Sequence, residues 1–195
     1  KRGVMRVAFQ VMGVTAGRKD SNCEILLKEA LLACREQGAE VRMINLKDYE
    51  LLDCTLHRLY HGHVHGEEHR LFPGGQGRQA EIMDVMLEPD AVIFSAPTYD
   101  LMPSSLFLKF MHRNLAYIGF LTKIGAIAPR DRVGALIAVG GSTRSWQSMA
   151  LECMQATTFT NSFKIVDMYM ATQVPPPPGA SLRGEGGRVR EMGLN

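Results

Sequence analysis

Two kinds of hydrophobic pattern alternate along this 195-residue chain. The first kind is a short, continuous apolar run, which is typical of a buried strand. Such runs lie at 4–14, 39–46, 90–96, 132–139 and 164–170. In the second kind, apolar residues recur at helical spacing. These segments lie at 22–37, 79–87, 101–117 and 146–158. The pattern therefore predicts strands and helices that alternate along most of the chain.

This alternation favours a parallel sheet with helices on both faces, because each right-handed crossover lays its helix across the sheet. The run at 90–96 is apolar almost throughout, as expected for a strand that is covered on both faces. The length is suited to one ordinary domain. We predict one α/β domain over 1–172 with five parallel strands, whose ligands bind beyond the carboxyl ends of the strands.

Two segments depart from the pattern. The irregular stretch 47–77 is longer than a compact domain normally leaves without structure, which indicates a functional or dimer-forming excursion. Residues 173–195 form a tail rich in proline and glycine, in which 188–192 look like the start of a terminal helix that the chain does not complete.

Composition and charge disfavour several classes of function and location. The 22 basic residues nearly balance the 20 acidic ones, so no broad positive field favours nucleic acid or an anionic membrane. The start of the chain faintly resembles a secretory signal, but Gln10 interrupts its apolar run, and we reject that interpretation. No stretch approaches the ~20 apolar residues of a membrane span. The cysteines show no CxxC spacing, so we expect free thiols and a cytoplasmic protein.

A candidate phosphate loop joins the first strand to the first helix, over 13–22. A phosphate there would meet backbone N–H groups and the positive end of the helix dipole. The loop matches neither the P-loop nor the dinucleotide fingerprint, so a monophosphate such as that of FMN fits better. The alternative is an ordinary turn with a Ser or Asn cap and a solvated arginine. The candidate ligands are Thr15, Gly17, Arg18, Ser21, Asn22 and Cys23.

Two further loops support this interpretation. Ser95-Ala96-Pro97-Thr98-Tyr99 precedes Met102-Pro103 and a helix with Lys109-Phe110-Met111-His112-Arg113, and Ala138-Val139-Gly140-Gly141-Ser142 follows the fourth strand. With these three loops the chain resembles, over about 4–170, the NADPH-dependent FMN reductase and iron-sulfur flavoprotein group of the flavodoxin-like superfamily. It departs from that pattern at Thr15, where serine is usual, and at His112, where aspartate is usual.

The resemblance implies a flavodoxin-like three-layer sandwich that binds FMN and forms homodimers or homotetramers. The flavin ring would be lined by Pro97, Thr98, Tyr99, Asp100, Leu101, Met102, Gly140, Gly141 and Ser142. Tyr99 could instead be a loop aromatic that covers the core. No side chain stands out as a catalytic acid or nucleophile, as expected where the flavin performs the electron chemistry.

The implied activity is transfer of hydride or electrons from NAD(P)H, or another donor, to a quinone, a flavin or another small acceptor. One alternative is a flavodoxin-type electron carrier without turnover of its own, but such carriers are usually strongly acidic and this chain is nearly neutral. Another is a degenerate scaffold that has lost the cofactor.

The irregular stretch also holds Cys54, which resembles the first cluster cysteine of the iron-sulfur flavoproteins. The other cluster cysteines are missing, so we predict no iron-sulfur cluster. We favour an exposed polar loop, and hence no metal, over a zinc-type site or a lid that brings a histidine to the substrate. The histidines concerned are His57, His61, His63, His65 and His69.

Overall fold

Five parallel strands form the centre of the fold in the computed structural model, which describes residues 8–51, 82, 86–123, 125, 132–141 and 147–172. Their order across the sheet is β2-β1-β3-β5-β6. The strands are β1 (Gln10–Thr15), β2 (Glu40–Asn45), β3 (Ala91–Tyr99), β5 (Arg132–Val139) and β6 (Phe163–Ala171). The order changes direction between β1 and β3, and such a switch point is where open α/β sheets bind ligands.

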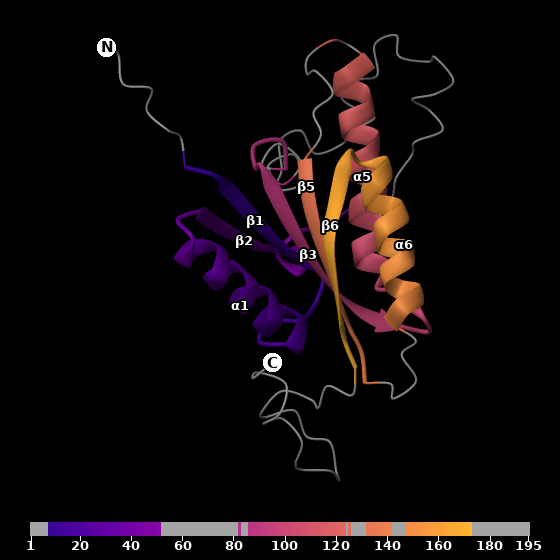
Figure 1. Ribbon diagram of the computed structural model, residues 1–195. Helices are drawn as coiled ribbons and strands as arrows, with labels where there is room; N and C mark the ends of the chain where they lie inside the picture. Colours follow the sequence, from indigo (N-terminus) through magenta and orange to yellow (C-terminus); the bar gives the residue numbers. More distant parts are fainter. Residues whose placement is uncertain are drawn as a thin grey trace.

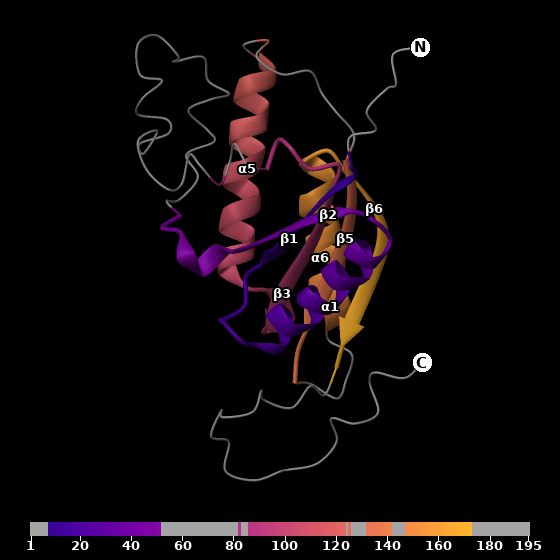
Figure 2. The same ribbon diagram turned by 90° about the vertical axis from the view of Figure 1, so that its left-hand side faces the viewer.

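Helices cover both faces of this sheet. α1 (Asn22–Glu36) lies on one face, and α5 (Ser105–Lys123) and α6 (Gln147–Thr160) lie on the other (Figure 1). Figure 2 shows α1 in front of the sheet and α6 behind it. A short 3-10 helix, η1 (Leu46–Asp48), follows β2. The predicted flavodoxin-like three-layer sandwich with a five-stranded parallel sheet is confirmed.

Two apolar cores hold the layers together. On the α5 and α6 face, Phe94 packs edge-to-face against Phe107 and Phe163, with ring centroids 5.9 Å and 5.3 Å away. On the other face, α1 lies so close to β1 that a Cβ at Gly13 would be 2.6 Å from Leu31 Cδ1. A Cβ there would displace the ends of the Leu31 and Leu27 side chains, so glycine at this position lets them pack directly against β1.

The predicted helix at 101–117 begins too early. β3 continues through Pro97 to Tyr99, and β4 (Met102–Pro103) then turns back and pairs antiparallel with the end of β3. The helix itself starts only at Ser105. The apolar residues that we assigned to its first turn therefore belong to a hairpin at the ligand-binding edge.

Several predictions fall on residues outside the described part of the chain. These are Cys54 and the five histidines of the irregular stretch, most of the helix expected at 79–87, and the tail from 173. The domain boundaries, the absence of a cluster and the role of the histidines therefore stay predictions. Within the described residues, the helices all fall short of the length and apolar character that crossing a membrane requires.

Candidate functional site

The ends of β1, β3 and β5 bring the three predicted loops to one edge of the sheet. The parallel register pairs Thr15 with Ser95 and Pro97 with Val139. Since all three strands run in the same direction, the loops that follow them open at the carboxyl edge. The predicted ligands therefore gather at this edge, except Ser142, which lies outside the described residues.

The first loop is a tight turn that only glycine can make. Thr15 is fully buried, and its Oγ1 accepts a hydrogen bond of 3.1 Å from Gly17 N. A Cβ at Gly17 would lie 2.5 Å from Ser21 Oγ and 2.7 Å from Cys23 Cβ, closer than atoms can approach. Gly17 thus allows the backbone to fold onto the start of α1, and Thr15 orders the turn from below.

At the start of α1, the hydroxyl of Ser21 makes no hydrogen bond. Ser21 is the N-cap residue and Glu24 lies three residues later, a spacing typical of a capping box. However, Ser21 makes no side-chain cap bond, and Glu24 Oε2 accepts from Asp20 N at 3.2 Å instead. Ser21 Oγ is buried and has no hydrogen-bond partner. Asn22, which we considered as a cap, is the first residue of the helix.

The buried carboxylate at the start of α1, Glu24, is paired with a lysine. Burial by itself raises the pKa of Glu24, but hydrogen bonds from Lys28, the Asp20 amide and Asn45, with the charge of Lys28, lower it overall. Lys28 Nζ lies 2.5 Å from Glu24 Oε1, so the positive charge of Lys28 neutralises the carboxylate that would otherwise repel an anion at this loop. Arg18 is exposed in the same loop, and a guanidinium is the kind of group that forms charge-assisted hydrogen bonds with phosphate.

Cys23 contributes packing rather than a thiolate. It is buried beneath Gly17, and burial, partly opposed by the neighbouring Ser95 hydroxyl, raises its pKa to about 11. Its thiol is therefore neutral at physiological pH. Ser95 Oγ donates to the Cys23 carbonyl at 2.9 Å, which ties the end of β3 to the start of α1.

The second loop is a strained hairpin. Tyr99 pairs with Met102 across it, and both side chains are exposed, by 63% and 41%. The two residues at the tip, Asp100 and Leu101, have φ of 45° and 70°. Non-glycine residues in this left-handed region cost about 1–2 kcal/mol each, and such strain gathers at functional sites. The hairpin therefore presents an aromatic and a thioether side chain next to each other at the carboxyl edge.

The base of this hairpin carries two hydroxyls without partners. Ser104 N donates to Pro97 O at 3.0 Å, and Ser104 O accepts from Leu108 N, so Ser104 joins the hairpin to α5. Its Oγ is buried and unbonded, as is Thr98 Oγ1 on the facing strand. Both atoms can donate to a ligand that reaches the base of the hairpin.

The third loop begins at Gly140, whose amide donates to Ala171 O at 3.0 Å. The side chain of Gln147, the first residue of α6, occupies the space that a Cβ at Gly140 would need. Gln147 is 1% exposed, and its Oε1 has no hydrogen-bond partner. Gly141 is exposed with open space around it.

Sequence reasoning missed Ser104 and Gln147. A serine just before a helical run is a recognisable cap signal, so Ser104 could have been found. Nothing in the local pattern points to Gln147, because its position depends on a contact with Gly140. Five buried side-chain atoms in the described residues have no partner, and four of them lie at the carboxyl edge. Those four are Ser21 Oγ, Thr98 Oγ1, Ser104 Oγ and Gln147 Oε1.

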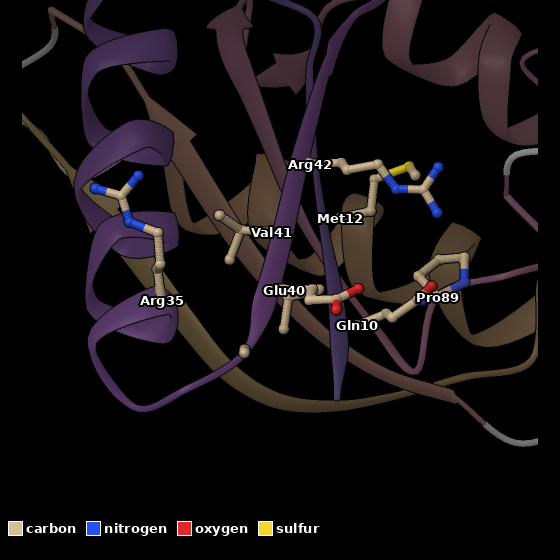
Figure 3. A pocket seen from close by; sticks show the side chains of 9 residues that line it. Gln10, Met12, Arg35, Glu40, Val41, Arg42 and Pro89 are labelled. Atoms are coloured by element: carbon tan, nitrogen blue, oxygen red, sulfur yellow. The ribbon is translucent and has the colours of Figure 1, made fainter. Parts of the chain in front are cut away.

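A hollow of about 520 Å³ lies at the opposite, amino edge of the sheet (Figure 3). Its charged residues include Arg42, which lies 2.7 Å from Glu88 and is thus already paired. Parallel sheets bind ligands at their carboxyl ends, so we assign no ligand to this hollow. Its lining is formed by Gln10, Val11, Met12, Arg35, Ala39, Glu40, Val41, Arg42 and Pro89.

The groups at the carboxyl edge can bind and orient a polar ligand, but no described side chain there stands out as a catalytic acid or nucleophile. Its described residues supply side-chain hydroxyls and an amide, backbone N–H groups, the exposed guanidinium of Arg18 and the exposed carboxylate of Asp100. Such a site needs a cofactor to carry out chemistry.

Comparison with known proteins identifies the kind of cofactor. The family model described as NADPH-dependent FMN reductase matches residues 10–174. An iron-sulfur flavoprotein of Methanocaldococcus jannaschii is 30% identical over 146 residues, which are 74% of this chain and 68% of that protein. These matches agree with the resemblance inferred from the three loops.

Solved structures show the same fold at lower identity. A structure titled flavone reductase has a TM-score of 0.62 and 22% identity over 85% of this chain, but this chain spans only 54% of it. An FMN-dependent NADH-azoreductase from Bacillus anthracis, solved in complex with FMN, has a TM-score of 0.57 and 12% identity, with 85% and 87% of the two chains covered.

Proposed function

The chain belongs to the NADPH-dependent FMN reductase family, and from this premise we propose that it binds FMN at the carboxyl edge of its sheet and passes hydride from NAD(P)H to a small acceptor. The predictions of an FMN-type flavoprotein oxidoreductase and of a nicotinamide co-substrate agree with this family. The proposal adds the site, the donor and the class of acceptor, for which we name a quinone, a free flavin or another small molecule.

The observation that carries the proposal is the set of four buried polar atoms without partners at one edge of the sheet. A buried polar atom without a hydrogen bond costs about 1–3 kcal/mol, so native proteins rarely leave several together unless a ligand completes them. Ser21 Oγ lies in the phosphate loop, and the other three atoms lie around the hairpin and Gly140. This division suits a ligand with a phosphate at one end and a polar ring at the other.

In this proposal the phosphate of FMN binds at the turn that Gly17 makes, with Ser21 and Arg18 as its side-chain ligands. The Thr15 hydroxyl and the amides at the start of α1 complete this end of the site. Because the opposite charges of Glu24 and Lys28 cancel, the charge of Arg18 is available to compensate the negative charge of the phosphate. The hydroxyl and amide groups would orient the phosphate through directed hydrogen bonds, and the arginine would attract it by its charge.

The flavin, when bound, accepts hydride and gives it up again. The chain's own residues would fix the ring and shield it. Tyr99 and Met102 offer apolar surface for a flat ring, and the strained tip at Asp100 and Leu101 holds them in place. Thr98, Pro97, Gly140, Gly141 and Ser142 would face its polar edge.

A titration of apoprotein with FMN, followed by flavin fluorescence, tests the phosphate end. Arg18→Ala should weaken binding by roughly tenfold to a hundredfold, because it removes a charge-assisted hydrogen bond. Arg35→Ala is the matched control, since Arg35 is an exposed arginine in the last turn of the same helix, at the opposite edge. Wild-type protein that is colourless after incubation with excess FMN and removal of the unbound flavin would refute the proposal.

Anaerobic mixing separates the reductase from the flavodoxin-type carrier, the second candidate. Rapid bleaching of the bound flavin by NADH or NADPH supports a reductase and identifies the preferred donor. FMN that stays bound but is not bleached by either nucleotide supports the carrier. The nearly neutral charge of the chain favours the first outcome, since carriers use a strong charge to steer redox partners.

The predicted homodimer or homotetramer and cytoplasmic location remain proposals. We infer the assembly from the family resemblance alone. The native mass of the FMN-loaded protein in solution, measured by light scattering, tests it, and a monomer under these conditions would contradict it.

A further inference from the structure

Gln147 lies in contact with the third loop of the site. It begins α6, and its side chain lies against the backbone of Gly140. A Cβ built on Gly140 would be 3.0 Å from Gln147 Cδ and 3.1 Å from Cγ, and it would collide with Nε2. Gly140 and Gln147 therefore fit each other, so the amide is held at the start of the loop rather than directed into solvent.

The register places this amide next to the hairpin as well. Pro97 pairs with Val139, so Thr98 and Gly140 follow one residue later on neighbouring strands. By the alternation of side chains along β3 and β5, Thr98 faces the same layer as Phe94 and the buried residues of α6. α6 also packs against β4. The unbonded Gln147 Oε1 and Thr98 Oγ1 thus belong to one corner of the site.

Gln147 differs chemically from the other unbonded groups. The hydroxyls of Ser21, Thr98 and Ser104 can donate as well as accept, so an anion or a carbonyl can complete them. Gln147 Oε1 can only accept, so it requires a ligand with an N–H or O–H group. A phosphate dianion cannot provide one. The oxidised isoalloxazine ring has a single N–H group, at N3, and this donor is on its pyrimidine edge.

We propose that Gln147 is a specificity-determining ligand of the flavin ring, whose Oε1 accepts a hydrogen bond from the ring N3–H. This inference rests on the proposed FMN site and adds a residue that sets which ring the site accepts. The same corner offers Thr98 and Ser104 as donors for the neighbouring ring carbonyls. A ring without a donor at N3 would leave Gln147 Oε1 buried and unpaired in the complex, which is a penalty against that ring.

The test compares FMN with 3-methyl-FMN, in which a methyl group replaces the N3 hydrogen. Wild-type apoprotein should bind 3-methyl-FMN at least about tenfold more weakly than FMN, measured by quenching of flavin fluorescence. Gln147→Met preserves length and flexibility but removes the amide. This variant should bind FMN about tenfold more weakly than wild type and should discriminate much less between the two flavins.

Two further variants separate this role from packing. Gln155→Met makes the same change at an exposed position of α6 and should leave both affinities unchanged. Gln147→Glu retains an acceptor of the same shape and should retain the preference for FMN over 3-methyl-FMN, even if the fold is less stable.

Equal discrimination by wild type, Gln147→Met and Gln147→Glu would overturn the inference, because N3 would then have another partner or none. The same holds if Gln147→Met fails to fold and Gln147→Glu shows no preference. These results are distinct from failure of the proposed function, in which wild-type protein would bind neither flavin.

Discussion

The two edges of the central sheet differ in how far their buried polar groups are hydrogen-bonded within the protein. At the amino edge, Arg132 donates to Met86 O and Asn161 O and lies 4.2 Å from the centre of the Phe163 ring. Thr158 Oγ1 there donates to Met154 O at 2.8 Å. At the carboxyl edge, Ser21, Thr98, Ser104 and Gln147 each have a buried atom without a partner.

One atom limits the contrast. Asn114 Oδ1 is also buried and unbonded, although Asn114 Nδ2 donates to Asn161 Oδ1 at 2.7 Å in the network near the amino edge. The difference between the edges is thus one of degree. The amino edge has one unbonded atom beside a connected network, whereas the carboxyl edge has four unbonded atoms around the proposed site. The protein itself completes the amino edge, whereas in the proposed function a ligand completes the carboxyl edge. Mutations at the two edges should therefore have opposite effects.

The largest effect should come from Arg132→Met, which breaks the amino-edge network. The change leaves two buried carbonyls without their donor and removes the contact with Phe163, so we expect a loss of about 3 kcal/mol in unfolding free energy. Urea unfolding of the apoprotein measures this. Arg42→Met is the control, because Arg42 and Glu88 form an exposed pair that contributes at most about 1 kcal/mol. Equal losses in the two variants would contradict the network.

Gly17→Ala should have the next largest effect and act at the other edge. The new Cβ would overlap Ser21 Oγ and Cys23 Cβ, so the loop must open, at a cost of about 1–3 kcal/mol in stability. FMN affinity should fall by more than tenfold, because the phosphate turn is lost. Gly119→Ala is the matched control: it lies in α5 with open space at its Cβ and should not weaken FMN binding. Unchanged FMN affinity in Gly17→Ala would exclude this turn as the phosphate site.

A pair of threonine variants tests the contrast most directly. Thr98→Val removes an unbonded hydroxyl at constant shape, so the apoprotein should become more stable by about 1 kcal/mol while FMN binds more weakly. Thr158→Val removes a bonded hydroxyl and should lower stability by about 1 kcal/mol without affecting FMN. Thermal unfolding with and without FMN measures both. A loss of apoprotein stability in Thr98→Val would show that this hydroxyl already has a partner.

The sequence predicted the layers of this fold because burial on both faces leaves a strong apolar signal. The run at 132–139, for example, has the same bounds as β5. The position of the first loop was also predictable, since glycine, serine and asparagine between an apolar run and a helical pattern mark a turn and the start of a helix. These signals are local, so a single sequence suffices to detect them.

The hairpin and Gln147 were not predictable for the opposite reason. Asp100 and Leu101 adopt left-handed backbone that their side chains disfavour, so local preference pointed to the helix that we expected from residue 101. The pairing of β4 with β3 outweighs that preference. Gln147 becomes part of the site only through its contact with Gly140, and the apolar pattern along the chain does not record such contacts.

The smallest expected effect concerns pH and the balanced charge beneath the phosphate loop. The hydrogen bonds and charge that outweigh burial lower the pKa of Glu24 in the folded protein below its unfolded value. Its contribution to stability is therefore fully present above the unfolded pKa, and it is lost as the pH falls through the folded pKa. Because Lys28 is half exposed, the pair contributes at most about 1 kcal/mol.

Glu24→Gln should accordingly be less stable than wild type at neutral pH, and the difference should shrink as the solution is acidified through the carboxyl range. Urea unfolding at a series of pH values measures this difference. Glu36→Gln, at an exposed position at the end of the same helix, serves as the control for general charge effects. A difference that is independent of pH would mean that ionisation of the Glu24 carboxyl group does not contribute to stability. The charge beneath the loop would then not be balanced in the way that the proposed phosphate site requires.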